Sequence, residues 1–256
     1  MSYLIHHGIK GQKWGVRNGP PYPIEDKVMP KGTRLDSVSS KYFNSKNYLN
    51  SGNALYAYNP NDPHDKKVYE GPFSKYLVLY RGAQFIARHS FETVQDLTMP
   101  TKKERMDEFK SLINDKKTRV DAIMEMRHIQ KRLVDGHVGS EKEQEEFKNI
   151  DLTNLKTDND YRIAYAIFNH AMEASYAYKS TREYMKRMQD KYDAMVDDNN
   201  QGVYNDAHDP VIIFRANKVL QEVKDKPVSF LSAKEIISNT EELREELKKK
   251  GINIKL

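Results

Sequence analysis

The run Val211-Ile212-Ile213-Phe214 decides how this chain folds. A short, continuous run of β-branched and aromatic residues is typical of a strand buried on both faces. No strand lies next to it in the sequence, yet its backbone N–H and C=O groups need partners, so it must pair with a distant strand. The sequence therefore predicts a small, largely antiparallel sheet that the N-terminal and C-terminal thirds of the chain share.

Candidate partner strands lie between Pro30 and Pro100, where aromatic and β-branched runs alternate with turn residues. The predicted strands are Leu55–Tyr58, Tyr76–Tyr80, His89–Val94 and, beyond the central run, Val228–Leu231. Residues 59–63 (Asn-Pro-Asn-Asp-Pro) form a loop between the first two strands. We expect residues of about 28–100 and 193–231 to form one sheet.

The middle of the chain, about residues 101–192, has a helical pattern. Capping boxes at Thr101–Glu104 and Ser140–Glu143 predict two helix starts. A helix after the first box should bury a stripe of residues at three- and four-residue steps: Met106, Phe109, Leu112, Ile113, Val120, Ile123 and Met124. A longer helix should run from about Asp160 to Asp190. The predicted fold class is thus α+β, with a single domain of residues 24–256.

Residues 1–23 form an N-terminal arm with its own character. It contains the sequence His-His-Gly-Ile-Lys-Gly-Gln-Lys-Trp-Gly-Val-Arg at positions 6–17, followed by the proline-rich spacer Gly19–Pro23. So short a segment buries too little surface to offset its ordering entropy alone. We interpret it as a docking peptide, with the partner-binding residues His6, His7, Lys10, Lys13, Trp14 and Arg17. The alternative is that Trp14 covers an apolar patch on the chain's own body.

Composition limits the function classes. The chain has no cysteine, which excludes disulfides, thiol nucleophiles and cysteine-ligated metal sites. The net charge is +5, from 42 basic against 37 acidic residues, and three of these five charges lie in the arm. We therefore expect no specific nucleic-acid binding. The sequence lacks an apolar run long enough to span a bilayer, so no membrane partner is expected.

The sequence of residues 6–17 resembles a phrase that recurs in virion proteins of tailed phages infecting Gram-positive bacteria, including head-morphogenesis proteins. This resemblance implies a phage virion-associated protein, either head-associated or a minor structural component. It also implies other phage structural proteins as partners of the arm. Synthesis would take place in the host bacterial cytoplasm, and the final location would be the virion.

The body resembles a family of phage proteins of unknown function that often carry the same phrase. The matching segments are residues 30–33, 68–71, 96–100, 192–199 and 209–214. Some such proteins are distantly similar to ADP-ribosyltransferases, which bind NAD in the cleft of a β-sandwich. Such an enzyme needs an arginine on an early strand, a Ser/Thr strand centre and a catalytic glutamate on a late strand. The similarity would assign the arginine to Arg34 and the strand centre to Ser37, Ser39 or Ser40. Asp197 or Asp198 would have to replace the glutamate.

Three hypotheses follow for the function. The favoured one is a non-catalytic virion protein without a cofactor, docking through its arm. The second is an ADP-ribosyltransferase-like enzyme carried in the particle, with NAD as cofactor and Arg34, Asp197 and Asp198 as catalytic candidates. The third is a protein that sequesters a host factor or nucleotide. Residues 197–202 resemble the first half of a calcium-binding loop, but its twelfth position is His208, where calcium needs a bidentate glutamate. No metal is therefore expected.

Overall fold

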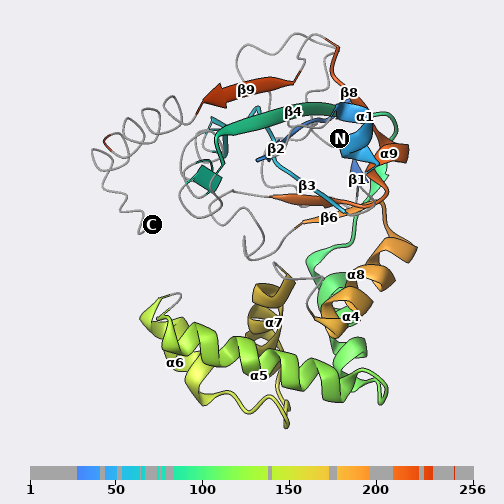
Figure 1. Ribbon diagram of the computed structural model, residues 1–256. Helices are drawn as coiled ribbons and strands as arrows, with labels where there is room; N and C mark the ends of the chain where they lie inside the picture. The colour runs from blue at the N-terminus through green and yellow to red at the C-terminus, as the bar shows by residue number, and fades with distance from the viewer. Residues whose placement is uncertain are drawn as a thin grey trace, which may run out of the picture.

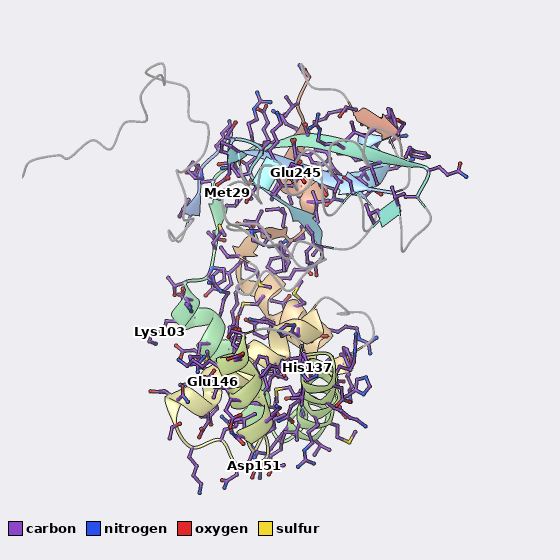
Figure 2. All side chains as sticks on the ribbon, turned by 90° about the vertical axis from the view of Figure 1, so that its left-hand side faces the viewer. Met29, Lys103, His137, Glu146, Asp151 and Glu245 are labelled. Atoms are coloured by element: carbon purple, nitrogen blue, oxygen red, sulfur yellow. The ribbon has the colours of Figure 1, made fainter. Side chains whose placement is uncertain are left out.

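The computed structural model describes residues 28–40, 44–50, 54–63, 65–66, 74, 77–78, 83–137, 140–172, 178–196, 210–224, 228–232 and 245. Its strands and its long helices occupy different parts of the molecule (Figure 1). In the view turned by 90°, Met29 and Glu245 lie at the sheet end, whereas Lys103, Glu146 and Asp151 lie among the helices (Figure 2). The predicted α+β class is confirmed, with antiparallel strands from both ends of the chain and a helical middle section.

The outer sheet is built around its longest strand, β4 (Phe85–Thr93). Strand β2 (Arg34–Ser39) pairs with β4 along one edge, and β8 (Leu220–Glu222) and β9 (Ser229–Ser232) pair with it along the other. The two-residue strands β1 (Val28–Met29) and β5 (Leu97–Thr98) form a separate pair. All of these pairings are antiparallel.

The second sheet contains the strand that the central apolar run predicts. Strand β7 (Val211–Ile213) lies between β3 (Leu55–Ala57) and β6 (Ala194–Val196). Its register pairs Ile212 with Tyr56 on one side and with Met195 on the other. The expected pairing of the run with a distant N-terminal strand is therefore confirmed.

In the described part of the chain, one isolated β-bridge connects the backbones of the outer and second sheets. The backbone N–H of Asp36 on β2 donates to the Tyr58 carbonyl, and the N–H of Tyr58 donates to the Asp36 carbonyl, both at 2.9 Å. The pairing does not extend into a regular ladder, so the described strands form three sheets, the third being the β1–β5 pair, rather than the single sheet expected from the sequence. The expectation of one continuous sheet is wrong in this respect.

Both faces of β7 are covered, which explains its unbroken apolar sequence. Side chains alternate across a strand. Ile212, with Met195, packs into the core formed mainly by the helices. Val211 and Ile213 pack on the opposite side, in a core shared with the outer sheet. The sheet β3–β7–β6 is therefore a middle layer between β2–β4 and the helices, as Figure 1 shows.

In the described residues, the middle of the chain forms helices α4 (Lys102–Asn114), α5 (Arg119–Asp135), α6 (Glu141–Asn149), α7 (Asp158–Met172) and α8 (Lys179–Lys191). Two shorter helices, α1 (Ser45–Leu49) and α9 (Ala216–Val219), lie against the sheets. The capping boxes at Thr101–Glu104 and Ser140–Glu143 are both formed, so the predicted starts of α4 and α6 are confirmed.

Two helical expectations are wrong. The apolar stripe from Met106 to Met124 is broken by a turn after Asn114, and α5 begins in a new rotational phase. As a result Val120 is 64% exposed and Met124 61% exposed, and the core side of α5 consists of Ala122, Met126, Ile129 and Leu133. The single helix expected over residues 160–190 is two helices, since Tyr178 has extended backbone angles at the start of α8.

The strand expected at Tyr76–Tyr80 is also wrong, because Leu77 and Val78 are helical and lie in a small core with Val38 and Ile86. Other expectations lie outside the described residues, namely the arm of residues 1–23 and the calcium-loop-like residues 197–208.

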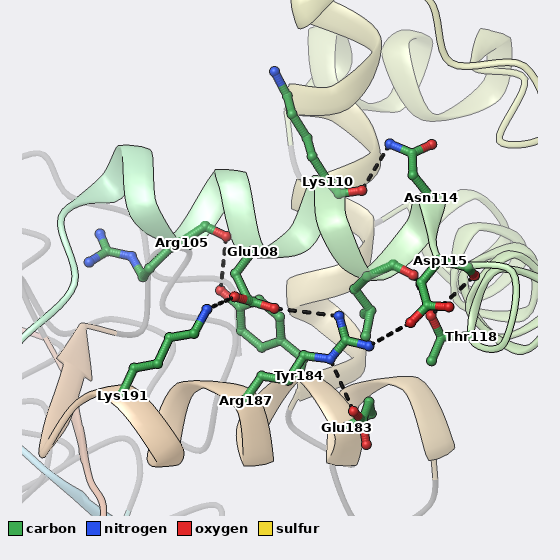
Figure 3. A network of polar contacts seen from close by, with 11 residues as sticks. Arg105, Glu108, Lys110, Asn114, Asp115, Thr118, Glu183, Tyr184, Arg187 and Lys191 are labelled. Atoms are coloured by element: carbon green, nitrogen blue, oxygen red, sulfur yellow. Dashed lines mark hydrogen bonds and ion pairs between the residues drawn. The ribbon is translucent and has the colours of Figure 1, made fainter.

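A charged network joins α4 to α8 (Figure 3). Glu108 is buried on α4 and forms ion pairs with Lys191 and, at 3.5 Å, with Arg187. Arg187 also pairs with Asp115 at 2.9 Å and with Glu183 at 3.0 Å. Since these residues come from both ends of the helical segment, the network fixes α8 against α4.

Candidate functional site

Arg34, the early-strand arginine of the sequence analysis, begins β2 directly after a tight turn. The turn is Pro30-Lys31-Gly32-Thr33, in which the Thr33 N–H donates to the Pro30 carbonyl at 3.2 Å. Gly32 has a φ of 81°, a value that favours glycine. The Thr93 hydroxyl also donates to the Pro30 carbonyl, at 2.8 Å, and so holds the turn against β4. These contacts fix where Arg34 enters the outer sheet.

The Arg34 guanidinium is paired across the strands. Glu92 on β4 is its register partner, and Arg34 Nε lies 3.4 Å from Glu92 Oε2. The Gln221 amide on β8 donates to the other carboxylate oxygen of Glu92 at 2.6 Å. The side chains of Arg34 and Glu92 are 32% and 25% exposed. Such a polar row across neighbouring strands is an ordinary stabilising feature of antiparallel sheets.

The other proposed site residues are not placed by the structure. Asp197 and Asp198 follow directly after β6 but lie outside the described residues. The same holds for His6, His7, Lys10, Lys13, Trp14 and Arg17 of the arm. Of the residues that the sequence suggested near Arg34, Ser37 is buried on β2, and its hydroxyl donates to the Tyr56 carbonyl at 2.7 Å.

A second cluster, which the sequence did not indicate, lies on the opposite face of the outer sheet. His89 on β4 is fully buried and is the register partner of Ser37. Tyr48 from α1 stacks on the His89 ring, with ring centroids 4.0 Å apart and planes within 8°. The Tyr48 hydroxyl lies 2.9 Å from Ser37 Oγ. The cluster of Ser37, Tyr48 and His89 thus brings a serine hydroxyl, a phenol and an imidazole together.

Burial governs the protonation of this cluster. It lowers the pKa of His89 to about 4, although the negative charge of Glu222 acts in the other direction. Burial likewise raises the pKa of Tyr48, against the effect of its hydrogen bond with Ser37. Among the residues that the structure describes, neither ring nitrogen of His89 has a hydrogen-bond partner. His89 is therefore neutral at pH 7.

The geometry of the cluster does not activate a nucleophile. A serine nucleophile needs a hydrogen bond from its hydroxyl to the base that takes its proton. Here the Ser37 hydroxyl donates instead to the Tyr56 carbonyl, and His89 makes no hydrogen bond to it. The alternation of side chains along β4 places His89 on the same face as Phe91, which is a core residue. That alternation was the one sequence signal for burial of His89.

Within the described part of the chain, no group of three or more His, Asp or Glu side chains is arranged to hold a metal ion. None of its helices combines the length and apolar character needed to cross a bilayer.

Comparisons with protein-family models, with curated proteins and with solved structures found no match to this chain.

Proposed function

We propose that this chain is a phage virion-associated protein that attaches to other phage structural proteins through its N-terminal arm and does not act as an enzyme. The observation that carries the proposal is the sequence of residues 6–17. It combines the only tryptophan of the chain with Lys10, Lys13 and Arg17, and it resembles a phrase of phage virion proteins. Tryptophan and arginine are the residues that most often dominate the binding energy of small interfaces.

The surroundings of Arg34 support a non-catalytic body. An arginine that binds the phosphates of a dinucleotide needs its guanidinium available to them. Arg34 is instead paired with Glu92, which is held in turn by Gln221. Arg34 then acts as a structural cross-strand residue of the outer sheet.

The test is the variant Trp14→Ala in the full-length chain. Its attachment to virions is measured by co-sedimentation with particles of the phage that encodes the chain, and its thermal midpoint is measured in parallel. We expect attachment to fall at least about tenfold, as for an aromatic anchor of an interface. The midpoint should change by less than about 2 °C, since a docking residue adds little to the stability of the body.

The matched control is Phe230→Ala, because Phe230 is a half-exposed aromatic on β9, in the body of the protein. It should leave attachment unchanged. Truncating a buried aromatic in a core costs about 3–5 kcal/mol. A large fall in the midpoint of Trp14→Ala would therefore assign Trp14 to the body and contradict the docking function. Undiminished attachment of Trp14→Ala would contradict it as well.

A further inference from the structure

Two apolar side chains of helix α5 are exposed to solvent and do not pack into the hydrophobic core. Val120 and Met124 are 64% and 61% exposed and lie one helical turn apart. Most other apolar residues of α5 are buried or partly buried against α4, α6, α7 and α8. Large apolar side chains that are exposed together and bordered by polar residues mark interaction sites.

Exposed cations flank this pair along the helix. Lys116 and Lys117 lie just before α5, and Arg127 and Lys131 follow Met124 on the same side. The two acidic residues in the first half of α5 already have partners. Asp121 forms an ion pair of 2.6 Å with Lys179, and Glu125 accepts hydrogen bonds from the start of α8. The net charge beside Val120 and Met124 is therefore positive.

The positive surface continues across a groove onto α8. A groove of about 240 Å³ between the two helices is lined by Thr118, Asp121, Lys179, Ser180, Arg182, Glu183 and Lys186. Lys179, Arg182 and Lys186 follow one side of α8 and are exposed, and Lys179 is the partner of Asp121 named above, so that pair adds no net charge. The carboxylate of Glu183 is bound by Arg187 at 3.0 Å. We call the exposed α5 residues Lys117, Val120, Met124, Arg127 and Lys131, with this groove, the α5–α8 surface.

We propose that the α5–α8 surface binds an acidic amphipathic helix of a partner protein. The apolar pair has the spacing of one helical turn, which matches two apolar side chains at positions i and i+4 of a partner helix. From Lys117 to Lys131 the surface spans about 21 Å, or about four turns of such a helix. Acidic residues on either side of the apolar pair of the partner helix then lie opposite Lys117 at one end of the surface and opposite Arg127 and Lys131 at the other.

Charge and chemistry favour this occupant over three others. A second copy of the chain would place like charges opposite one another, which disfavours pairing. A nucleic acid backbone would be bound by the cations but would leave Val120 and Met124 without a role. A lipid surface would use both, but the cations of α8 line a groove rather than a flat face.

The probe is a fluorescent, acetylated 18-residue peptide with two central leucines at i and i+4 and glutamates toward both ends. The control peptide has the same composition, with the leucines on opposite helix faces. Binding to the full-length chain is followed by fluorescence anisotropy at low and high salt. The patterned peptide should bind at least about tenfold more tightly than the control, because only it can bury both leucines on Val120 and Met124. Added salt should weaken that binding.

Two sets of variants locate the binding. Val120→Ser with Met124→Ser, and Lys117→Glu with Lys131→Glu, should each weaken binding of the patterned peptide at least about tenfold. All four residues are exposed, so these variants should keep the thermal midpoint of the parent. The matched controls are Phe230→Ser and Lys102→Glu, which change exposed residues on β9 and at the start of α4. They should bind the peptide as the parent does.

Each of the following results overturns the proposal. Equal binding of the two peptides means that charge alone is recognised. Tighter binding of a DNA duplex, or of phosphatidylserine vesicles, that persists in Val120→Ser with Met124→Ser assigns the surface to phosphate groups. Absence of binding, or equal loss in the control variants, shows that the α5–α8 surface is not a docking site.

Discussion

The carboxylate of Glu125 on α5 accepts a hydrogen bond of 2.9 Å from the backbone N–H of Ser180, at the start of α8. The N–H of Lys179 donates to the same carboxylate at 2.8 Å, and the Ser180 hydroxyl contacts it as well. The residue at the N-cap position, Tyr178, provides no side-chain cap. Helix α8 is therefore capped by a residue of another helix. The negative charge of Glu125 also interacts favourably with the positive, N-terminal end of the α8 dipole.

Glu125→Ala should destabilise the protein by about 1–2 kcal/mol, the usual cost of losing a helix cap. The measurement is urea-induced unfolding, with the slope of the transition unchanged if only stability is affected. Asp190→Ala is the control, because Asp190 is an exposed acid at the opposite end of α8. Its loss should have almost no effect. Equal stabilities of the two variants would show that Glu125 does not cap α8.

The network around Glu108 gives a second stability prediction (Figure 3). Glu108→Ala leaves Lys191 without its carboxylate partner, and Arg187 loses one of its three. Arg187 is only 21% exposed, and removing an acceptor from such a partly buried charged donor costs about 1–3 kcal/mol. Asp107→Ala, one position away, removes an exposed i,i+4 ion pair with Lys103 and should cost at most about 0.5 kcal/mol. Chemical denaturation of both variants checks the difference, and a larger loss in Asp107→Ala would contradict it.

Features determined by neighbouring residues could be predicted from the sequence. The helix starts at Thr101 and Ser140 depend on two side chains three positions apart, and both were correct. The pairing of β7 followed from its backbone groups needing a partner. The exposure of Val120 and Met124 could not be predicted in the same way. It depends on the turn after Asn114, which changes the rotational phase between α4 and α5.

The side-chain contacts of the candidate site could be predicted less well from the sequence. Arg34 was correctly expected on an early strand, but its pairing with Glu92 depends on the register between β2 and β4, across a long stretch of chain. The stacking of Tyr48 on His89 depends on how α1 packs against the outer sheet. Both contacts arise from tertiary structure, and no spacing in the sequence encodes them.

Two histidines predict a loss of stability in mild acid: His89, which is fully buried, and His170 on α7, which is partly buried. Burial lowers the pKa of both His89 and His170 to about 4, from an ordinary value of 6.5. Above pH 6.5 each is neutral whether the chain is folded or not, so stability is fully present there. Between pH 6.5 and 4 the unfolded chain binds protons that the folded chain does not, so stability falls. For His89 the loss amounts to roughly 3 kcal/mol by pH 4.

His89→Phe should reduce this loss, because phenylalanine keeps a stacking ring and does not titrate. His128→Phe, at an exposed position of α5, is the control and should retain the acid sensitivity of the parent. Urea unfolding at intervals between pH 7 and pH 4 measures both. Carboxylates such as Asp151 and Asp160, whose pKa values are lowered below 3.8 by hydrogen bonds, lose their contribution only at lower pH. If the stability of His89→Phe falls with pH as much as that of the parent, His89 is not a source of the acid sensitivity.

The last prediction concerns Arg34 and the enzyme hypothesis. The Arg34–Glu92 pair is partly exposed, so Arg34→Ala should cost less than about 1 kcal/mol of stability. If Arg34 is structural, the full-length protein should not consume NAD above background, and neither should Arg34→Ala or Asp197→Ala. The opposite result is turnover by the parent with a fall of about 10²-fold or more in both variants, equal to about 2.7 kcal/mol of transition-state stabilisation. Because Glu92 would then compete with substrate for the guanidinium, Glu92→Gln should raise turnover in that case, which gives an independent check on the role of Arg34.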